Sequence, residues 1–378
     1  MSDIVVRGVG MHPFGRFEGK SAIEMGCDAL REALADARID WKEVDAVYCA
    51  HMYAGTGAGH KIAAIMGATG IPIVNIENAC SSGTAAIVMA RQALQSGEHT
   101  TVVAVGIEKM SRGFMDMDYF DAWRQRVGHA VNPAQFAFAI RRHMHDYGTT
   151  ERQLALVAEK NHAHSVHNER AMYRKPISAD EILASRLIVD PLRLLMLCTP
   201  NEGAAAAVLS RRKGAAGDVR LIGHGLKTTT RMQPIGEHVP TDSPIGISGD
   251  SVSRRTALQA YEWAGIGSAD LDVVELQDTD SGTEIIATEE IGLCAAGEGG
   301  ALVESGATRL GGRIPVNPSG GLLSKGEPVG ASGLGQVFEI VSQLRGRCGP
   351  RQVANAKIGL THTLGAGGNC CVLLFERS

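Results

Sequence analysis

One cysteine stands where the chain passes from an expected strand into an expected helix. The apolar run at residues 71–76 ends shortly before Cys80, and small residues then lead into a helical pattern that continues to Leu94. This order places the thiol at a helix N-terminus, where free backbone N–H groups and the helix dipole stabilise a thiolate. The small residues at 79–83 leave room for a carbonyl group to approach the sulfur. Cys80 is therefore a candidate nucleophile, although a buried cysteine that fills a tight turn would give the same local pattern.

The composition excludes several classes of protein. The 378 residues include 44% hydrophobic and 21% charged residues, and the net charge is −4, which gives no indication of a nucleic-acid surface. No apolar run reaches the roughly 18–20 residues that span a membrane, and the N-terminus lacks a signal pattern. The eight cysteines form no CxxC pair, which argues against a disulfide framework and against a structural zinc site. We expect a cytoplasmic protein with no nucleic-acid or membrane partner.

The first hundred residues alternate between strands and helices. We expect strands at 4–9, 44–49, 71–76 and 101–106, and helices at 22–37, 60–66 and after Cys80. This alternation predicts a mostly parallel sheet that is covered by helices on both faces.

The alternation stops at Glu108, and the chain is predicted to be helical and polar as far as about Gly217. Three histidines, at 162, 164 and 167, lie close together in this stretch. The first two do not share a helix face, and no carboxylate or cysteine completes a ligand set, so we expect no metal site.

The alternation resumes at Val219 and repeats the first pattern. Helices are expected at 255–263, 283–293 and 330–344, and strands at 273–276, 314–317, 357–361 and 370–375. The segment around Asp45 aligns with the segment around Asp272 at a constant offset of 227 residues (272 − 45). We infer a duplicated α/β unit, with one half at residues 1–218, which carries a helical insertion, and the other at 219–378. The duplication brings two helix N-termini face to face, where the site of an α/β protein is expected.

A set of short motifs, in this order, resembles the thiolase superfamily and in particular the thiolase part of sterol-carrier-protein-x. The motifs are Asn78-Ala-Cys80-Ser-Ser-Gly83, Gly106-Ile-Glu108-Lys-Met-Ser111, His143-Met-His-Asp-Tyr147-Gly148, Lys160-Asn-His162-Ala-His-Ser, Cys198-Thr-Pro200-Asn-Glu-Gly203, Asn317-Pro-Ser-Gly320, Gly330-Ala-Ser-Gly333 and His362-Thr-Leu-Gly365-Ala-Gly-Gly368. The resemblance runs nearly end to end. It implies a homodimer with a five-layered α-β-α-β-α fold and a loop domain, here at about 107–217, that covers a coenzyme A site. It implies no tightly bound cofactor and no metal, with coenzyme A as substrate or product.

The resemblance also assigns roles around Cys80. It makes this thiol the nucleophile that forms an acyl-enzyme from an acyl-CoA or 3-ketoacyl-CoA, and a thiolate suits that step because it attacks and leaves readily. The tetrahedral oxyanion needs N–H donors, for which the resemblance offers Cys80 itself and the turn that contains Gly365 and Gly367.

Two positions depart from the family pattern. Where thiolases usually carry Gly-His-Pro, this chain has Gly326-Glu327-Pro328, and where the branch carries His-Asp-Cys-Phe, with a second acid/base cysteine, this chain has Gln277-Asp278-Thr279-Asp280. A buried carboxyl group such as Glu327 can act as a base, or as a donor once it is protonated. Gln277 could donate to an oxyanion, Asp278 is expected to hold the turn, and Asp280 could face the pocket or solvent.

Two histidines remain as alternatives to Glu327 for the base. His143 matches a family histidine near the pocket, but a packing role is the alternative that its place in the loop domain favours, and His362 precedes the oxyanion turn. The predicted site residues are the catalytic candidates Cys80, Glu327, His362 and His143, and the oxyanion or pocket residues Gly365, Gly367, Gln277 and Thr279.

These observations lead to three hypotheses for function. The first is a thiolase-like acyltransferase that makes or cleaves a C–C bond through an acyl-Cys80 intermediate, on a branched, aromatic or carboxylated 3-ketoacyl-CoA of lipid or aromatic degradation. The second is a thiolase-fold aldolase that acts on a 3-hydroxyacyl-CoA, which loss of the usual histidine and second cysteine would suit. The third is a non-catalytic subunit of a complex. Relatives in this branch pair with a small zinc-ribbon and OB-fold protein, so we expect that such a partner is possible here.

Overall fold

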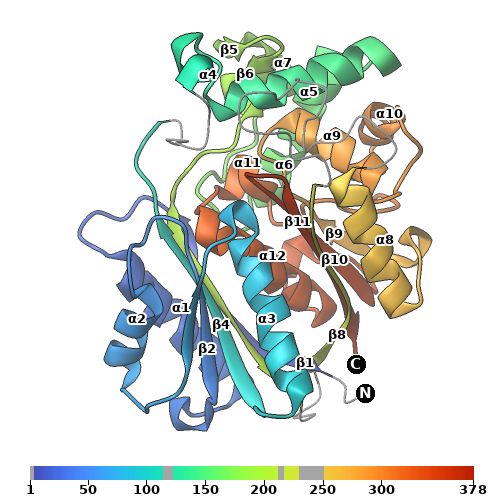
Figure 1. Cartoon of the computed structure of the whole chain (residues 1–378). Coiled ribbons are helices and arrows are strands. Elements are labelled where there is room, and N and C mark those ends of the chain that lie inside the picture. The colour runs from blue at the N-terminus through green and yellow to red at the C-terminus, as the bar shows by residue number, and fades with distance from the viewer. Residues whose placement is uncertain (1–3, 114–121, 212–216, 230–250) are drawn as a thin grey trace.

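A single mixed sheet organises the protein (Figure 1). The computed structural model describes residues 4–113, 122–211, 217–229 and 251–378. Nine strands in these ranges pair in the order β3-β2-β4-β7-β1-β8-β11-β10-β9. The strands of this sheet are β1 (Val5–Gly15), β2 (Ala46–Ala50), β3 (Ile73–Ile76), β4 (Thr101–Lys109), β7 (Glu202–Ser210), β8 (Val219–Thr228), β9 (Val273–Glu275), β10 (Ile358–Gly365) and β11 (Asn369–Arg377).

Helices cover both faces of the sheet and fill the space between its two halves. The helices are α1 (Ala22–Ala37), α2 (Ala58–Met66), α3 (Ser82–Ser96), α4 (Ala122–Arg126), α5 (Asn132–Tyr147), α6 (Glu151–Ser165), α7 (Ala179–Ala184), α8 (Val252–Ala264), α9 (Ser281–Glu290), α10 (Gly299–Glu304), α11 (Gly321–Lys325) and α12 (Val329–Leu344). Alternate side chains of β4 and β7 pack against α1 and α2 on one face, and against α3 and α12 on the other. In the second half, β11 likewise lies between α12 and α8. The layers therefore follow the predicted order α-β-α-β-α, with α3 and α12 in the centre (Figure 1).

The two halves repeat one another down to single hydrogen bonds. In the first half the Asp45 carboxylate accepts the backbone N–H groups of Thr100 and Thr101 at 2.7 and 2.9 Å, at the start of β4. In the second half the Asp272 carboxylate accepts those of Lys357 and Ile358 at 2.7 and 2.9 Å, at the start of β10. The aligned aspartates thus tie equivalent pairs of parallel strands, β2 to β4 and β9 to β10.

The chain between β4 and β7 forms a separate group of elements above one end of the sheet (Figure 1). It contains α4 to α7 and the two-stranded sheet of β5 (Leu187–Val189) and β6 (Leu192–Arg193). Apolar side chains of α5 and α6 pack against α9 and α11 of the second half. The insertion in the first half therefore rests on the second half.

The sequence prediction of a helical stretch up to Gly217 is wrong at its C-terminal end. Glu202–Ser210 forms β7, which lies antiparallel between β4 and β1, and all nine of its residues are buried. Its run of four alanines, at 204–207, favours a helix by intrinsic propensity. Packing decides otherwise, because α1 and α12 cover the two faces of β7 closely and small side chains fit between them.

The expected strand at 314–317 is reduced to an isolated bridge. Val316 pairs with Val274 in parallel, at the place that β3 occupies beside β2 in the first half. Pro315 and Pro318 flank this pair and have no N–H to donate to a neighbouring strand. The second half therefore keeps the position of this strand, but the pairing is reduced to a single bridge.

Replacing either repeated aspartate tests its structural role. We expect Asp45→Ala and Asp272→Ala each to lower the free energy of unfolding by about 1–3 kcal/mol, because each leaves two backbone N–H groups without their acceptor. Urea unfolding followed by circular dichroism measures the change. Glu262→Ala, an exposed change on α8, is the control; aspartate variants that unfold at the same urea concentration as this control would contradict the assignment.

Candidate active site

Cys80 occupies a constrained turn between β3 and α3. Its neighbour Ala79 has a positive φ of 47°, which is unusual for a residue with a side chain. Two side-chain acceptors hold this turn: Glu77 accepts the N–H of Ala79 at 2.7 Å, and the Ser82 hydroxyl accepts the N–H of Asn78 at 2.7 Å. Cys80 is 5% exposed and directly precedes the first turn of α3. The backbone is thus held in a costly conformation that presents one thiol at a helix N-terminus.

Glu327 enters the same region from the turn between α11 and α12. Its backbone N–H donates to the carbonyl of Thr199 at 3.0 Å, and it pairs in parallel with Pro200. Gly326 has a φ of 102°, and a side chain there would overlap the Asn201 amide. The segment before β7 therefore fixes the position of Glu327, and this residue is 2% exposed.

Three side chains meet at the Glu327 carboxyl group. Cys198 Sγ donates to Glu327 Oε2 at 2.8 Å, and Gln277 Nε2 donates to Glu327 Oε1 at 2.8 Å. The thiol of Cys80 is the third hydrogen-bonding neighbour of this carboxyl group. The structure thus brings together the predicted residues Cys80, Glu327 and Gln277, and it adds Cys198.

The charges of this cluster depend on one another. Burial raises the pKa of Glu327, and its three hydrogen-bonding neighbours act in the opposite direction. Burial, followed by the charge of Glu327, raises the pKa of Cys80 well above its ordinary value. The same two causes raise the pKa of Cys198. The resting site therefore holds two protonated thiols beside one carboxyl group, and this arrangement can pass a proton from sulfur to oxygen when a substrate arrives.

Two backbone N–H groups lie at the Cys80 sulfur. Hydrogen bonds from the N–H of Ala366 and from that of Cys80 itself act to lower the pKa of this thiol. Ala366 lies in the turn between β10 and β11, where Gly367 has a φ of 80°. Gly365 packs directly on the carbonyl of Asn78, where an added Cβ would stand at 2.9 Å. The predicted glycines thus shape the turn, while the residue between them directs its N–H to the Cys80 sulfur.

The structure does not bring the two predicted histidines to this cluster. His143 lies on α5, where its Nε2 meets both carboxylate oxygens of Glu289 at 3.0 Å and its Nδ1 meets the Thr149 hydroxyl at 2.8 Å. Both ring nitrogens are thus engaged in joining α5 to α9, and in the described residues no hydrogen bond links His143 to the cluster around Glu327. His362 lies on β10 and its Nε2 meets the Ser253 hydroxyl of α8 at 3.0 Å.

The alternation along β10 explains the place of His362. The next residue, Thr363, meets the Thr84 hydroxyl of α3 at 2.6 Å, so it is Thr363 that faces the central layer. The imidazole of His362 points to the outer layer, away from the helix that Cys80 begins. Burial lowers the pKa of His362 to about 4, so it is neutral at ordinary pH.

The segment Gln277–Asp280 joins the site to a buried polar scaffold. Asp278 accepts the N–H of Leu322 at 2.7 Å, at the start of α11, and Asn161 donates to it at 2.8 Å. It holds the turn, as the sequence suggested. Asp280 is fully buried as the N-cap of α9, so it faces neither a pocket nor solvent. Thr279 accepts the backbone N–H of Cys198 at 2.9 Å, which places it directly beside the second thiol.

Sequence reasoning missed Cys198 as a site residue. It was noticed only as the first residue of a motif, in a stretch expected to be helical. The segment that carries it is extended and bridges to Asp280 and Glu327 before β7 begins, and this tertiary contact is what brings Cys198 to the site.

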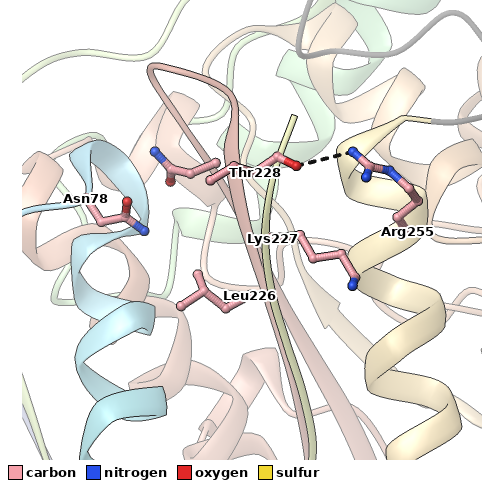
Figure 2. Close-up of a pocket in the computed structure, with 6 residues that line it drawn as sticks. Asn78, Leu226, Lys227, Thr228 and Arg255 are labelled. Carbon is pink, nitrogen blue, oxygen red and sulfur yellow. Dashed lines mark hydrogen bonds between the residues drawn. The ribbon is translucent and has the colours of Figure 1, made fainter. Parts of the chain in front are cut away.

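A pocket of about 460 Å³ adjoins the loop that precedes Cys80. It is lined by Asn78, Leu226, Lys227, Thr228, Arg255 and Asn369. Figure 2 shows Asn78 beside α3 and Arg255 on α8, with the Thr228 carbonyl bonded to Arg255 at 3.2 Å. The pocket therefore combines an apolar side chain with two cationic ones.

The described ranges contain neither a membrane-spanning helix nor a group of metal ligands. No helix there is long and apolar enough to cross a membrane. No three potential ligands of the types His, Cys, Asp and Glu gather there in a way that could hold a metal ion.

Comparison with protein families identifies the chain. The family model for the thiolase N-terminal domain matches residues 4–213, and the model for the thiolase C-terminal domain-like region matches residues 248–375. The chain belongs to the thiolase family. The resemblance predicted from the motifs is therefore confirmed, and the two matches fall on the two halves of the thiolase fold.

Individual thiolase relatives match over nearly the whole chain. Sterol carrier protein 2 of Oryctolagus cuniculus is 38% identical, over 99% of this chain and 72% of that protein. An acetyl-CoA acetyltransferase of Methanothermobacter thermautotrophicus is 35% identical over 100% of both chains. The benzoylsuccinyl-CoA thiolase subunit BbsB of Thauera aromatica is 32% identical, over 96% and 95%. A solved structure described as an Ltp2-ChsH2(DUF35) aldolase has a TM-score of 0.86 at 23% identity and covers 100% of this chain and 98% of that one, which shows the shared fold.

The charge of Glu327 gives a testable prediction for the thiolase nucleophile. Because the carboxylate helps to raise the pKa of Cys80, Glu327→Gln removes that contribution and the pKa of Cys80 falls. We expect the pH profile of Cys80 alkylation by iodoacetamide to move down by about 1–3 pH units. Peptide mass spectrometry measures alkylation at Cys80, and Glu262→Gln is the control. An unchanged profile in Glu327→Gln would show that the two groups do not interact.

Proposed function

We propose that the protein is a thiolase-type acyltransferase that cleaves or forms the C–C bond of a 3-ketoacyl-CoA through an acyl-Cys80 intermediate. The observation that carries this proposal is the Cys80 thiol beside the buried Glu327 carboxyl group, with the N–H groups of Cys80 and Ala366 at the sulfur. The relatives described as an acetyl-CoA acetyltransferase and as a thiolase subunit support the same reaction class.

The carboxyl group can serve both steps of the acylation. As a carboxylate, Glu327 takes the proton of Cys80 when the sulfur attacks the ketone carbon. It is then neutral, so it does not repel the negative charge that develops as the C–C bond breaks. The raised pKa of Glu327 favours this neutral form at the moment when it is needed. The backbone N–H groups of Cys80 and Ala366 bind the oxyanion.

The substrate in this proposal is not a simple linear 3-ketoacyl-CoA. A glutamate at 327 and a threonine at 279 replace the groups with which thiolases usually polarise and protonate such a substrate. The pocket beside Asn78 offers one apolar and two cationic side chains, which suits an acyl group that carries a ring, a branch or a carboxylate. One relative is described as acting on benzoylsuccinyl-CoA, which is both aromatic and carboxylated.

A panel of 3-ketoacyl-CoA esters tests the proposal. We expect incubation with acetoacetyl-, 2-methylacetoacetyl-, benzoylacetyl- and 3-oxoadipyl-CoA to give, with at least one ester, a mass increase on Cys80 that corresponds to the acyl fragment containing C3. Cys80→Ala removes the adduct and the cleavage of that ester. Cys294→Ala is the control, because Cys294 is a partly exposed free thiol whose hydrogen-bonding neighbour is Thr288, at 4.0 Å, and not the Glu327 carboxyl group.

Other outcomes would assign the chain to the alternative functions. Cleavage that persists in Cys80→Ala contradicts the acyl-enzyme. Release of an aldehyde from a 3-hydroxyacyl-CoA, unaffected by iodoacetamide, would identify an aldolase instead.

We also infer that the enzyme works as a homodimer together with a small partner protein. One relative is described as a thiolase subunit, and one structural neighbour is described with a DUF35 partner, which supports a shared assembly. Native purification followed by light scattering tests this inference, and a monomer without a partner would contradict it.

A further inference from the structure

The site holds a second thiol that the proposed acylation of Cys80 does not use. Cys198 donates to the same carboxyl group as Cys80, at 2.8 Å, and it is partly accessible while Glu327 is almost fully buried. Its backbone is held against residues 279 and 280. The N–H of Cys198 donates to the Thr279 carbonyl, and the neighbouring Leu197 forms a bridge with Asp280.

Cys198 lies beside Thr279, one of the positions at which the chain departs from the family pattern. The branch that this chain resembles has a cysteine where the chain has Thr279, and Cys198 is directly hydrogen-bonded to the backbone of that residue. The thiol therefore comes from the adjacent segment and not from position 279, and it reaches the same carboxyl group. A proton-transfer group is still present beside Glu327, but a different part of the chain supplies it.

We propose that Cys198 is the catalytic acid and base for the substrate carbon, and that it exchanges its proton with Glu327. This proposal rests on the proposed function. In this proposal Glu327 exchanges protons with Cys80, and Cys198 exchanges protons with C2 of the substrate.

The steps balance for cleavage of a 3-ketoacyl-CoA. The Cys80 proton moves to the Glu327 carboxylate, and the thiolate forms a bond to the C3 ketone carbon. The C2–C3 bond breaks, its electron pair goes to C2, and C2 takes the proton of Cys198. The Cys198 thiolate then recovers a proton from the neutral Glu327. An acyl-CoA product and the acyl-Cys80 thioester remain, with Glu327 ionised and Cys198 protonated as at the start.

The second half of the reaction does not need Cys198. The thiol of coenzyme A gives its proton to Glu327, attacks the acyl-Cys80 carbonyl and displaces the Cys80 thiolate, which takes the proton back. No carbon is protonated in this exchange of one thioester for another. The two half-reactions thus separate the role of Cys198 from that of Cys80.

The protonation state of Cys198 before the reaction suits a catalytic acid. Burial and the charge of Glu327 raise the pKa of Cys198, so the thiol keeps its proton until a carbanion forms beside it. Transfer of a proton by a positioned side chain is worth about 10²–10⁴ in rate.

Variants of Cys198 test the proposal against a merely positioning role. We expect Cys198→Ala and Cys198→Ser to lower C–C cleavage of the best ester of the panel by about 10²–10⁴. Both variants should keep the acylation of Cys80 by an acyl-CoA and its exchange with free coenzyme A. Deuterium uptake from D₂O at C2 of the acyl-CoA product should fall together with cleavage. Restoring the family position in Cys198→Ala/Thr279→Cys should recover part of the lost cleavage.

Three results would overturn the proposal. The first is cleavage within about threefold of wild type in Cys198→Ala. The second is full cleavage in Cys198→Ser, because a hydroxyl can hold Glu327 by a hydrogen bond but is a much weaker acid, so rescue by serine would show a positioning residue. The third is equal loss of thioester exchange and cleavage. Cys294→Ala controls for loss of a thiol, and thermal unfolding of each variant controls for folding. Failure of the proposed function would look different, since wild-type Cys80 would then take up no acyl group at all.

Discussion

The close approach of α3 and α12 in the central layer is the constraint on which the site depends. A side chain at Gly83 of α3 would stand 2.9 Å from the backbone nitrogen of Leu334, and one at Gly106 of β4 would overlap the Gly330 carbonyl. Glycine at these places lets the helices pack nearly backbone to backbone. Cys80 precedes α3 and Glu327 precedes α12, so this contact brings the thiol and the carboxyl group together from segments about 250 residues apart (327 − 80 = 247).

Burial then gives this contact its chemical character. Cys80 and Glu327 are buried, so water does little to screen the carboxyl group from this thiol. A buried charge without partners would be costly, but Glu327 has hydrogen bonds to both oxygens. Burial sets the direction of each pKa change in the cluster, because it is the largest cause that raises the pKa of Glu327, of Cys80 and of Cys198. The contact between α3 and α12 thus both buries these groups and places them where a proton can pass between them.

The fold and about half of the site could be predicted from the sequence. The duplication could be predicted from two signals: the periodicity of the strands and helices, and the constant offset between Asp45 and Asp272. Both can be read from the sequence without knowledge of tertiary contacts. The prediction failed at β7, whose alanines favour a helix in isolation and form a strand only because the neighbouring helices leave no other room. Tertiary packing of this kind leaves no local signal.

In the site, too, residues within recognisable motifs could be predicted, and residues whose roles depend on tertiary contacts could not. Cys80 and Glu327 were found because each interrupts or completes a short motif. His362 was misplaced because its orientation depends on the alternation along β10, in which Thr363 faces the centre. Cys198 was missed because its role depends on contact with Thr279 and Glu327, 81 and 129 residues away (279 − 198 and 327 − 198), which no spacing along the chain reveals.

The exchange of histidine for glutamate changes the charge with which the site meets its substrate. A histidine base is neutral before it takes a proton and cationic afterwards, so it attracts the anion that forms next. Glu327 is anionic before and neutral afterwards, so it can offer that anion a hydrogen bond but no charge. Stabilisation of the anion must then come from the N–H groups at Cys80 and Ala366, or from the substrate itself. An enolate with its own electron-withdrawing group supplies part of that stabilisation. The substitution at position 327 therefore supports the proposal that the substrate is not a simple linear 3-ketoacyl-CoA.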